Sequence, residues 1–254
     1  YSFNKKNTFK TMNKEDICYL PAYEMFEKIK TQELTSLEIT EAIIERANKI
    51  NKKINAYCTP TFDLARDMAK KADMEVKKGE NLGILNGIPT SIKDLSLTKG
   101  IRTTFGSKIY EEFVPKVDSV YVKKLKNAGC VILGKTNTPE FGFKGVTDNE
   151  IFGTTKNPWN LNKTSGGSSG GAGAAIASGI SPLAQGSDGG GSIRIPASLN
   201  GVYGIKPTFG RVPVYPKEYI FAHTLSAVGP LARYVKDAAL MLDAMKGYFE
   251  GYRY

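Results

Sequence analysis

The amino-acid sequence is poor in histidine and in cysteine. Its 254 residues contain one histidine, His223, and three cysteines, Cys18, Cys58 and Cys130. A serine–histidine–aspartate triad would have to use His223 as its base, and a lone histidine is more often packed or hydrogen-bonded than catalytic. One histidine and scattered cysteines also form no cluster of zinc ligands. We therefore expect no histidine-based triad, no metal site and no cofactor.

Long apolar runs are also missing. No stretch approaches the ~18 apolar residues that a membrane-spanning helix needs, and residues 1–6 lack the apolar segment of a signal peptide. The cysteines are odd in number, and Cys130 begins the apolar run Cys130-Val131-Ile132-Leu133, where we expect a buried free thiol. These features predict a cytoplasmic protein that does not contact a membrane.

Arginine is scarce among the basic residues. The net charge is +10, but only seven of the 35 basic side chains are arginine. Arginine is favoured where phosphates or bases are bound, because its planar guanidinium makes paired hydrogen bonds. The lysines are scattered along the surfaces of expected helices, so we interpret the charge as a solvated basic surface and not as a nucleic-acid site.

Apolar residues recur with the periods of helices and strands in alternation. Thr35 and Glu38 have the spacing of a capping box at the start of an amphipathic helix, and Asp118 is expected to cap a later one. From Gly87 onward, short apolar strands alternate with helices, which is typical of an α/β layer architecture with a largely buried sheet. The expected helices cover residues 35–50, 63–78, 118–128, 172–177 and 235–245, and the expected strands cover 88–92, 130–133 and 183–185.

Glycine is exceptionally dense between Ser165 and Gly210. Residues 165–171 have the composition of a flexible linker, which is one interpretation of the run. The run, however, passes directly into an expected helix and then into an expected strand, whereas a linker would join two domains. We therefore expect these glycines to serve close backbone approach or unusual dihedral angles.

Residues 129–136, Gly-Cys-Val-Ile-Leu-Gly-Lys-Thr, match the expression for a phosphate-binding loop. Such a loop needs a strand before it and a helix after it, with its backbone amides curled around phosphate. Here the four variable positions form an apolar strand, a helix precedes them, and Pro139 follows shortly after. The context of a nucleotide site is therefore missing.

Three segments together offer a base, paired hydroxyls and a nucleophile. Lys93 lies at the end of an expected apolar strand, Ser168 and Ser169 lie among glycines, and Ser192 follows three glycines. Hydroxyls and a lysine can carry nucleophilic catalysis when the lysine is neutral, and a glycine-rich backbone can donate to a developing oxyanion. Burial at the end of an apolar strand would lower the pKa of Lys93, and the neighbouring Asp94 should point to the opposite side of the strand.

At these segments the sequence resembles the amidase signature family. The resemblance runs from about Leu82 to Leu242 and includes the 24-residue separation of Ser168 from Ser192. Any single motif would be weak, but the set in its order is highly specific. The flanking words that agree are Gly134-Lys135-Thr136-Asn137, Asn157-Pro158-Trp159-Asn160, Gly204-Ile205-Lys206-Pro207-Thr208 and Gly229-Pro230-Leu231-Ala232-Arg233.

The resemblance implies a Ser–cis-Ser–Lys triad. Ser192 would attack the amide carbonyl, Ser168 would relay its proton from behind a Gly167–Ser168 cis peptide, and Lys93 would be the final base. Ser169, Asp188 and Arg194 would support this machinery, the last two as a pair that holds the loop before Ser192. The oxyanion would be met by the backbone N–H groups of Gly189, Gly190, Gly191 and Ser192.

The resemblance also implies a fold and an extent. We expect a mixed β-sheet core covered by helices on both sides, with residues 1–80 as an N-terminal helical segment packed on an α/β core of residues 81–254. Family members generally continue well beyond the segment Gly229–Arg233, so we expect this chain to lack the C-terminal part of the fold. Gly189 departs from the threonine or isoleucine often found there, which should loosen the loop without removing its amide.

Three functions remain open at this stage. The first is a free-standing amidase that acts on a small-molecule amide, alone or as a homodimer, and Ile195 favours it because the second candidate usually has glutamine there. The second is the glutaminase subunit of a tRNA-dependent amidotransferase, which would need a partner protein and charged tRNA. The third is an inactive fragment that serves as a binding or scaffold module.

Overall fold

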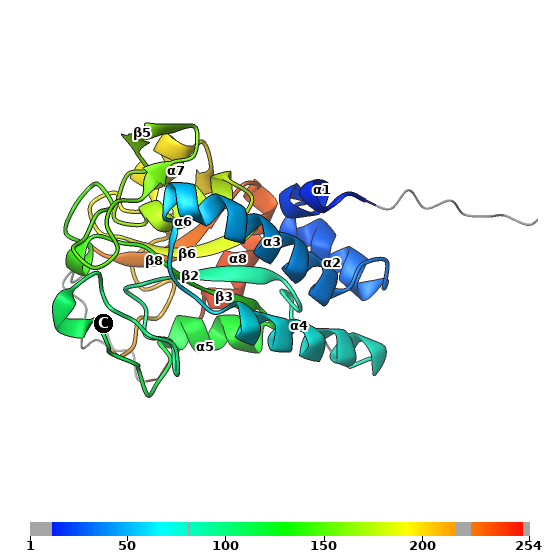
Figure 1. Cartoon of the computed structure of the whole chain (residues 1–254). Helices are drawn as coiled ribbons and strands as arrows, with labels where there is room; N and C mark the ends of the chain where they lie inside the picture. The colour runs from blue at the N-terminus through cyan, green and yellow to red at the C-terminus, as the bar shows by residue number, and fades with distance from the viewer. Residues whose placement is uncertain (1–11, 81, 217–224, 251–254) are drawn as a thin grey trace, which may run out of the picture.

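A mixed six-stranded sheet forms the centre of the protein (Figure 1). The computed structural model describes residues 12–80, 82–216 and 225–250. The strand order is β1-β3-β2-β6-β8-β7, in which β2 pairs in parallel with β3 and β6 while the other neighbours are antiparallel. The strands are β1 (Tyr57–Pro60), β2 (Pro89–Lys93), β3 (Val131–Thr136), β6 (Leu183–Asp188), β7 (Tyr203–Gly204) and β8 (Ala227–Ala232).

Helices cover both faces of this sheet, as the α/β prediction requires. Figure 1 shows α6 and α3 above the strands and α5 below them, and α5 packs against α8. A separate hairpin pairs β4 (Lys156–Asn157) with β5 (Asn160–Thr164). The helices are α1 (Lys14–Tyr19), α2 (Ala22–Lys30), α3 (Ser36–Ile54), α4 (Phe62–Lys77), α5 (Val120–Asn127), α6 (Gly170–Ala177), α7 (Arg194–Asn200) and α8 (Val235–Met245), with short 3₁₀ turns at Lys108–Tyr110 and Glu140–Gly142.

The predicted helix starts are confirmed in one case and wrong in another. Thr35 and Glu38 form the complete capping box at the start of α3. Asp118 does not cap α5, whose N-cap is Ser119. The Asp118 carboxylate instead accepts from the backbone N–H of Lys99 and pairs with Lys126. The Asp118 side chain therefore makes these contacts in place of the predicted cap of α5.

The strand β3 is buried along its whole length, which explains the apolar run at its start. Val131, Ile132 and Leu133 are fully buried, and Cys130 is a buried free thiol as predicted. The segment that matched a phosphate-binding loop is the strand β3, so the interpretation against such a loop is confirmed. Its lysine, Lys135, is fully buried and donates to Ser96 O and to two threonine hydroxyls.

The glycines of α6 allow neighbouring backbones to approach closely. A Cβ at Gly171 would collide with the backbone of Asn137, which follows β3, and one at Gly173 would lie 2.8 Å from Asn200 Nδ2 on α7. Residues 165–171 are buried throughout. The run is therefore a packed element of the core, as expected, and not a linker.

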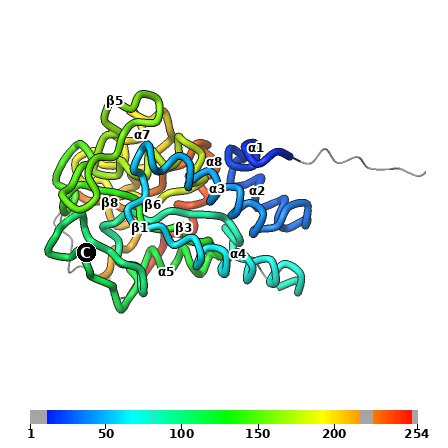
Figure 2. Tube along the Cα trace, viewed as in Figure 1, coloured from blue at the N-terminus to red at the C-terminus, as the bar shows by residue number. Residues whose placement is uncertain are grey.

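The N-terminal helices pack on the rest of the chain through a shared hydrophobic core. Figure 2 shows α1 and α2 beside α8, although these elements come from opposite ends of the sequence. The buried Asp237 of α8 accepts from the backbone N–H groups of Ala22 and Tyr23 at 2.8 and 3.0 Å, which caps the first turn of α2. A domain boundary between residues 80 and 81 stays a prediction. His223 lies outside the described residues.

Within the described ranges, no helix has the length and apolar character that crossing a membrane demands.

We predict that Asp237→Ala lowers the free energy of unfolding by about 1–2 kcal/mol, because two N–H groups at the start of α2 lose their acceptor. Urea unfolding followed by circular dichroism measures the change. Asp243→Ala on the same helix is the matched control, since Asp243 is exposed and pairs only with Lys246 among described residues. It should change stability by less than about 0.5 kcal/mol. Equal stability of the two variants would contradict this capping role.

Candidate active site

The amine of Lys93 is enclosed by three serine hydroxyls. Lys93 is the last residue of β2 and is fully buried. Its Nζ donates to Ser168 Oγ at 2.7 Å, to Ser169 Oγ at 2.8 Å and to Ser187 Oγ at 3.1 Å. The backbone N–H of Lys93 is held by Gln185 Oε1 at 3.1 Å. The register of β2 against β6 therefore fixes both ends of this residue.

Burial lowers the pKa of the Lys93 amine to about 7, because the charged form loses its hydration. The charge of Asp188 opposes this shift. Asp94 does not contribute, because its carboxylate accepts from Thr104 at 2.6 Å and lies 3.7 Å from Lys135 Nζ. This agrees with the prediction that Asp94 points away from Lys93. At neutral pH a substantial fraction of Lys93 is therefore neutral and can accept a proton.

Ser168 is presented by a tight turn of backbone. The Gly167–Ser168 peptide is cis, the geometry that the resemblance implied. A Cβ at Gly167 would lie 2.6 Å from Val146 O, so only glycine lets these two backbones pack together. Thr147 brackets the turn, because its hydroxyl donates to Gly166 O at 2.8 Å and accepts from Gly170 N at 3.1 Å.

Ser192 lies in the turn between β6 and α7. Its backbone carbonyl accepts from Ser169 N at 3.1 Å, which ties this turn to the segment that carries Ser168. The residue is half-buried, and its hydroxyl makes no hydrogen bond to any residue that the structure describes. A nucleophile needs a hydroxyl that the substrate can contact and that is not held by another hydrogen bond.

Asp188 and Arg194 form a bidentate ion pair at this turn. Arg194 Nε and a terminal nitrogen both lie 2.9 Å from the Asp188 carboxylate, which also accepts from the backbone N–H groups of Ile193 and Arg194. Burial would raise the pKa of Asp188, but the guanidinium and the backbone donors outweigh it and lower the pKa to about 2. The pair is therefore ionised at neutral pH and holds the loop from one side.

One of the four predicted oxyanion donors is already occupied. Gly191 N donates to Asp188 Oδ1 at 2.8 Å, which differs from the expectation that it faces a substrate. The φ of Gly191 is +122°, and this conformation turns its N–H toward the carboxylate. Over the described part of the chain, the amides of Gly189, Gly190 and Ser192 donate to no other residue. These three remain candidates for binding an oxyanion.

Two further site residues, Ser187 and Thr147, were not singled out from the sequence. Ser187 could have been found by strand periodicity, because Gln185 and Ser187 lie two residues apart on β6 and both contact Lys93. Thr147 carried no such signal. It comes from an irregular segment, and only the three-dimensional fold brings its hydroxyl to the turn around Ser168.

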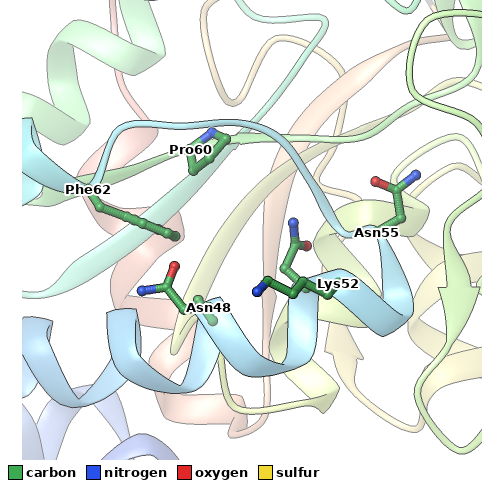
Figure 3. A pocket seen from close by; sticks show the side chains of 7 residues that line it. Asn48, Lys52, Asn55, Pro60 and Phe62 are labelled. Atoms are coloured by element: carbon green, nitrogen blue, oxygen red, sulfur yellow. The ribbon is translucent and has the colours of Figure 1, made fainter.

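A hollow elsewhere on the surface lies between α3 and the segment that joins the end of β1 to the start of α4, where Pro60 and Phe62 lie (Figure 3). None of its lining residues contacts Lys93. They are Ala47, Asn48, Asn51, Lys52, Asn55, Pro60 and Phe62. The side chains of Asn51 and Asn55 are already used in hydrogen bonds to backbone carbonyls. This hollow is therefore not part of the serine–lysine site.

The sequence of this chain is similar to those of known proteins. The family model described as Amidase matches residues 38–252. A curated relative from Carboxydothermus hydrogenoformans, which is named as a subunit of glutamyl-tRNA(Gln) amidotransferase, is 46% identical over 92% of this chain and 48% of its own length. The chain thus spans about half the length of the curated relatives it matches.

Solved structures agree with the sequence comparison. A bacterial aryl acylamidase described as an amidase signature enzyme superposes with a TM-score of 0.87 and 38% identity, over 92% of this chain and 49% of its own. A peptide amidase from Stenotrophomonas maltophilia superposes with a TM-score of 0.85 and 32% identity, over 91% of this chain and 49% of its own. The predicted fold is confirmed by these likenesses.

We predict that Gly167→Ala costs about 1–3 kcal/mol of folding free energy, because the added methyl group would overlap the backbone of Val146. Thermal unfolding measures the loss. The control is Gly145→Ala, at the residue before Val146, where an added Cβ has no heavy atom within 4 Å. That variant should unfold close to the wild-type temperature, and a loss as large as that of Gly167→Ala would refute the steric explanation.

Proposed function

The chain belongs to the amidase family, and on this basis we propose that it hydrolyses carboxylic amides through an acyl-enzyme on Ser192. The observation that carries the proposal is the buried contact of 2.7 Å between Lys93 Nζ and Ser168 Oγ, in a segment that is joined to Ser192 by the hydrogen bond from Ser169 N to Ser192 O. Burial supplies a lysine that is partly neutral near pH 7, and a neutral amine is the base that a serine relay needs.

The chemistry runs as a two-step acyl transfer. Lys93 takes the hydroxyl proton of Ser168, Ser168 takes that of Ser192, and Ser192 Oγ forms a bond to the amide carbonyl carbon. The proton returns through Ser168 to the leaving nitrogen as the C–N bond breaks. A water molecule then gives its proton to the same relay, attacks the acyl-enzyme, and releases the carboxylate and the free Ser192 hydroxyl.

The oxyanion formed in both steps would be met by the amides of Gly189, Gly190 and Ser192. Each such donor typically contributes about 2.7–4 kcal/mol to lowering the barrier. Asp188 and Arg194 support this loop without touching the substrate, since the carboxylate holds Gly191 N–H while the guanidinium neutralises its charge. In this arrangement Gly191 shapes the loop and does not itself bind the oxyanion.

We predict that the rate of amide hydrolysis rises with pH along a limb centred at about 7. The reason is that the protonated form of Lys93, which dominates below its pKa, cannot accept the relayed proton. Initial rates measured from pH 5 to pH 9 would show the limb. A rate that falls or stays constant as the pH rises through 7 would contradict the assignment of Lys93 as the base.

Two serine variants serve as controls for this measurement. Ser192→Ala should lose about 10³-fold or more in turnover at every pH, because the nucleophile itself is gone. Ser198→Ala, at an exposed position of α7, should keep the wild-type rate and the wild-type limb. Wild-type turnover in Ser192→Ala would overturn the proposed function.

A second candidate is the glutaminase subunit of a tRNA-dependent amidotransferase. It is favoured by the curated relatives, which are named as subunits of glutamyl-tRNA(Gln) amidotransferase and are 43–47% identical to this chain. The same serine–lysine site would then release ammonia from glutamine, and a partner protein would use this ammonia on the charged tRNA. The net charge of +10 is compatible with tRNA nearby, whereas Ile195 had favoured a free-standing amidase.

The three free thiols suit a cytoplasmic location for either candidate function.

Ammonia release separates the two candidates. A free-standing amidase should release ammonia from simple aliphatic or aromatic amides without tRNA, ATP or a second protein. A glutaminase subunit should act on glutamine and gain about tenfold or more in rate when its partner and charged tRNA are added, because allosteric coupling of this kind is typically worth about 5–150-fold. The amidotransferase would be excluded if simple amides were turned over faster than glutamine even when the partner protein and charged tRNA are present.

A further inference from the structure

Ser187 is a third hydroxyl on the amine of Lys93, and the proposed relay does not use it. Lys93 Nζ donates to Ser187 Oγ at 3.1 Å, besides its contacts to Ser168 and Ser169. Ser187 lies on β6, one residue before Asp188, and its own side chain is half-buried. The role of this contact depends on how many N–H groups the amine carries.

The count changes when Lys93 loses its proton. The ammonium has three N–H groups and can donate to all three serines at once. The neutral amine keeps two N–H groups and gains one lone pair, so two serines must accept from it and one must donate to it. The relay, on which this inference rests as part of the proposed function, works only if the donating hydroxyl belongs to Ser168.

The hydroxyl of Ser169 is already directed elsewhere. Its oxygen lies 3.3 Å from the backbone carbonyl of Ser187 and donates to it. With that hydrogen committed, Ser169 can only accept from Lys93, at 2.8 Å. Ser169 therefore takes one of the two N–H groups of the neutral amine.

Ser168 and Ser187 differ in what else their hydroxyl hydrogens can reach. Ser168 is only 2% exposed and has no other acceptor among the described residues, and a buried O–H group left without an acceptor is costly. Ser187 is half-buried, so its hydrogen can be donated to water while its oxygen accepts from Lys93.

We infer that Ser187 is a positioning residue: together with Ser169 it holds the two N–H groups of neutral Lys93 and so turns the lone pair toward Ser168. Without Ser187 the amine could rotate, and Ser168 would more often accept from it than donate to it. Ser187 touches neither the substrate nor the reacting bond, and acts only through the orientation of the base.

The same contact affects the ionisation of Lys93 in a defined direction. A hydrogen bond from the ammonium to Ser187 favours the charged form, so its loss should lower the pKa of Lys93. Over the described residues, Asp188 on β6 is the charged group that acts on Lys93, and it is itself paired with Arg194. Asp94 and Lys135 pair with each other away from the amine. These charges are unchanged when Ser187 is replaced.

The test compares Ser187→Ala with Ser187→Thr, which keeps the hydroxyl and suits a strand position. The first readout is the titration of Lys93 by NMR of protein carrying ¹³C at lysine Cε, with the signal identified by its loss in Lys93→Met. The second is the rate at which a fluorophosphonate probe labels the protein as a function of pH. The NMR titration needs no catalysis, so it reports on Ser187 even if wild-type protein fails to react with the probe and the proposed function falls.

Ser187→Ala should move both the NMR titration and the labelling limb to lower pH, while the labelling rate on the alkaline plateau falls about three- to tenfold, the scale of one lost hydrogen bond. Ser187→Thr should restore both. General damage to the fold would lower the plateau without moving the titration, and that result would overturn the inference. The inference would also be overturned if Ser187→Ala left both the NMR titration and the labelling rate unchanged, or if Ser187→Thr were as impaired as Ser187→Ala.

Discussion

Removing the amine of Lys93 from water disfavours its charged form, because three neutral hydroxyls replace its hydration and no described residue forms an ion pair with it. The charge of Asp188 opposes this effect, and Asp188 is itself ion-paired with Arg194. The result is a lysine with a pKa of about 7 in a protein where most lysines are solvated. The proposed chemistry depends on this one desolvated group.

The fold shields the Lys93 amine from water and fixes its position. β2 lies between β3 and β6 as the central parallel strand, so its last residue is enclosed on both sides. Glycines at the start of α6 let the turn carrying Ser168 approach closely, and Ser169 N joins this turn to the carbonyl of Ser192. The second buried lysine, Lys135, shows the same effect to a smaller extent: burial lowers its pKa to about 8, and the charge of Asp94, 3.7 Å away, opposes the shift.

Periodicity was enough to predict the α/β class and most central elements, and the resemblance to the amidase signature family implied that Lys93 meets Ser168. They could not predict what tertiary contacts decide. Asp118 has the right spacing for a cap but binds Lys99 and Lys126 instead, and Gly191 has the right neighbours for an oxyanion donor but gives its N–H to Asp188. Thr147 was invisible in the sequence because no local pattern links it to the turn that it brackets.

In the proposed mechanism Ser192, and neither Ser168 nor Ser169, forms the covalent bond to the acyl group. Peptide mapping by mass spectrometry, after the protein has been trapped with an activated ester that deacylates slowly, tests this claim most directly. We expect one acyl group on the peptide that carries Ser192, in an amount that follows the neutral fraction of Lys93. An acyl group on the peptide of Ser168 and Ser169, or a yield unaffected by Lys93→Met, would contradict it.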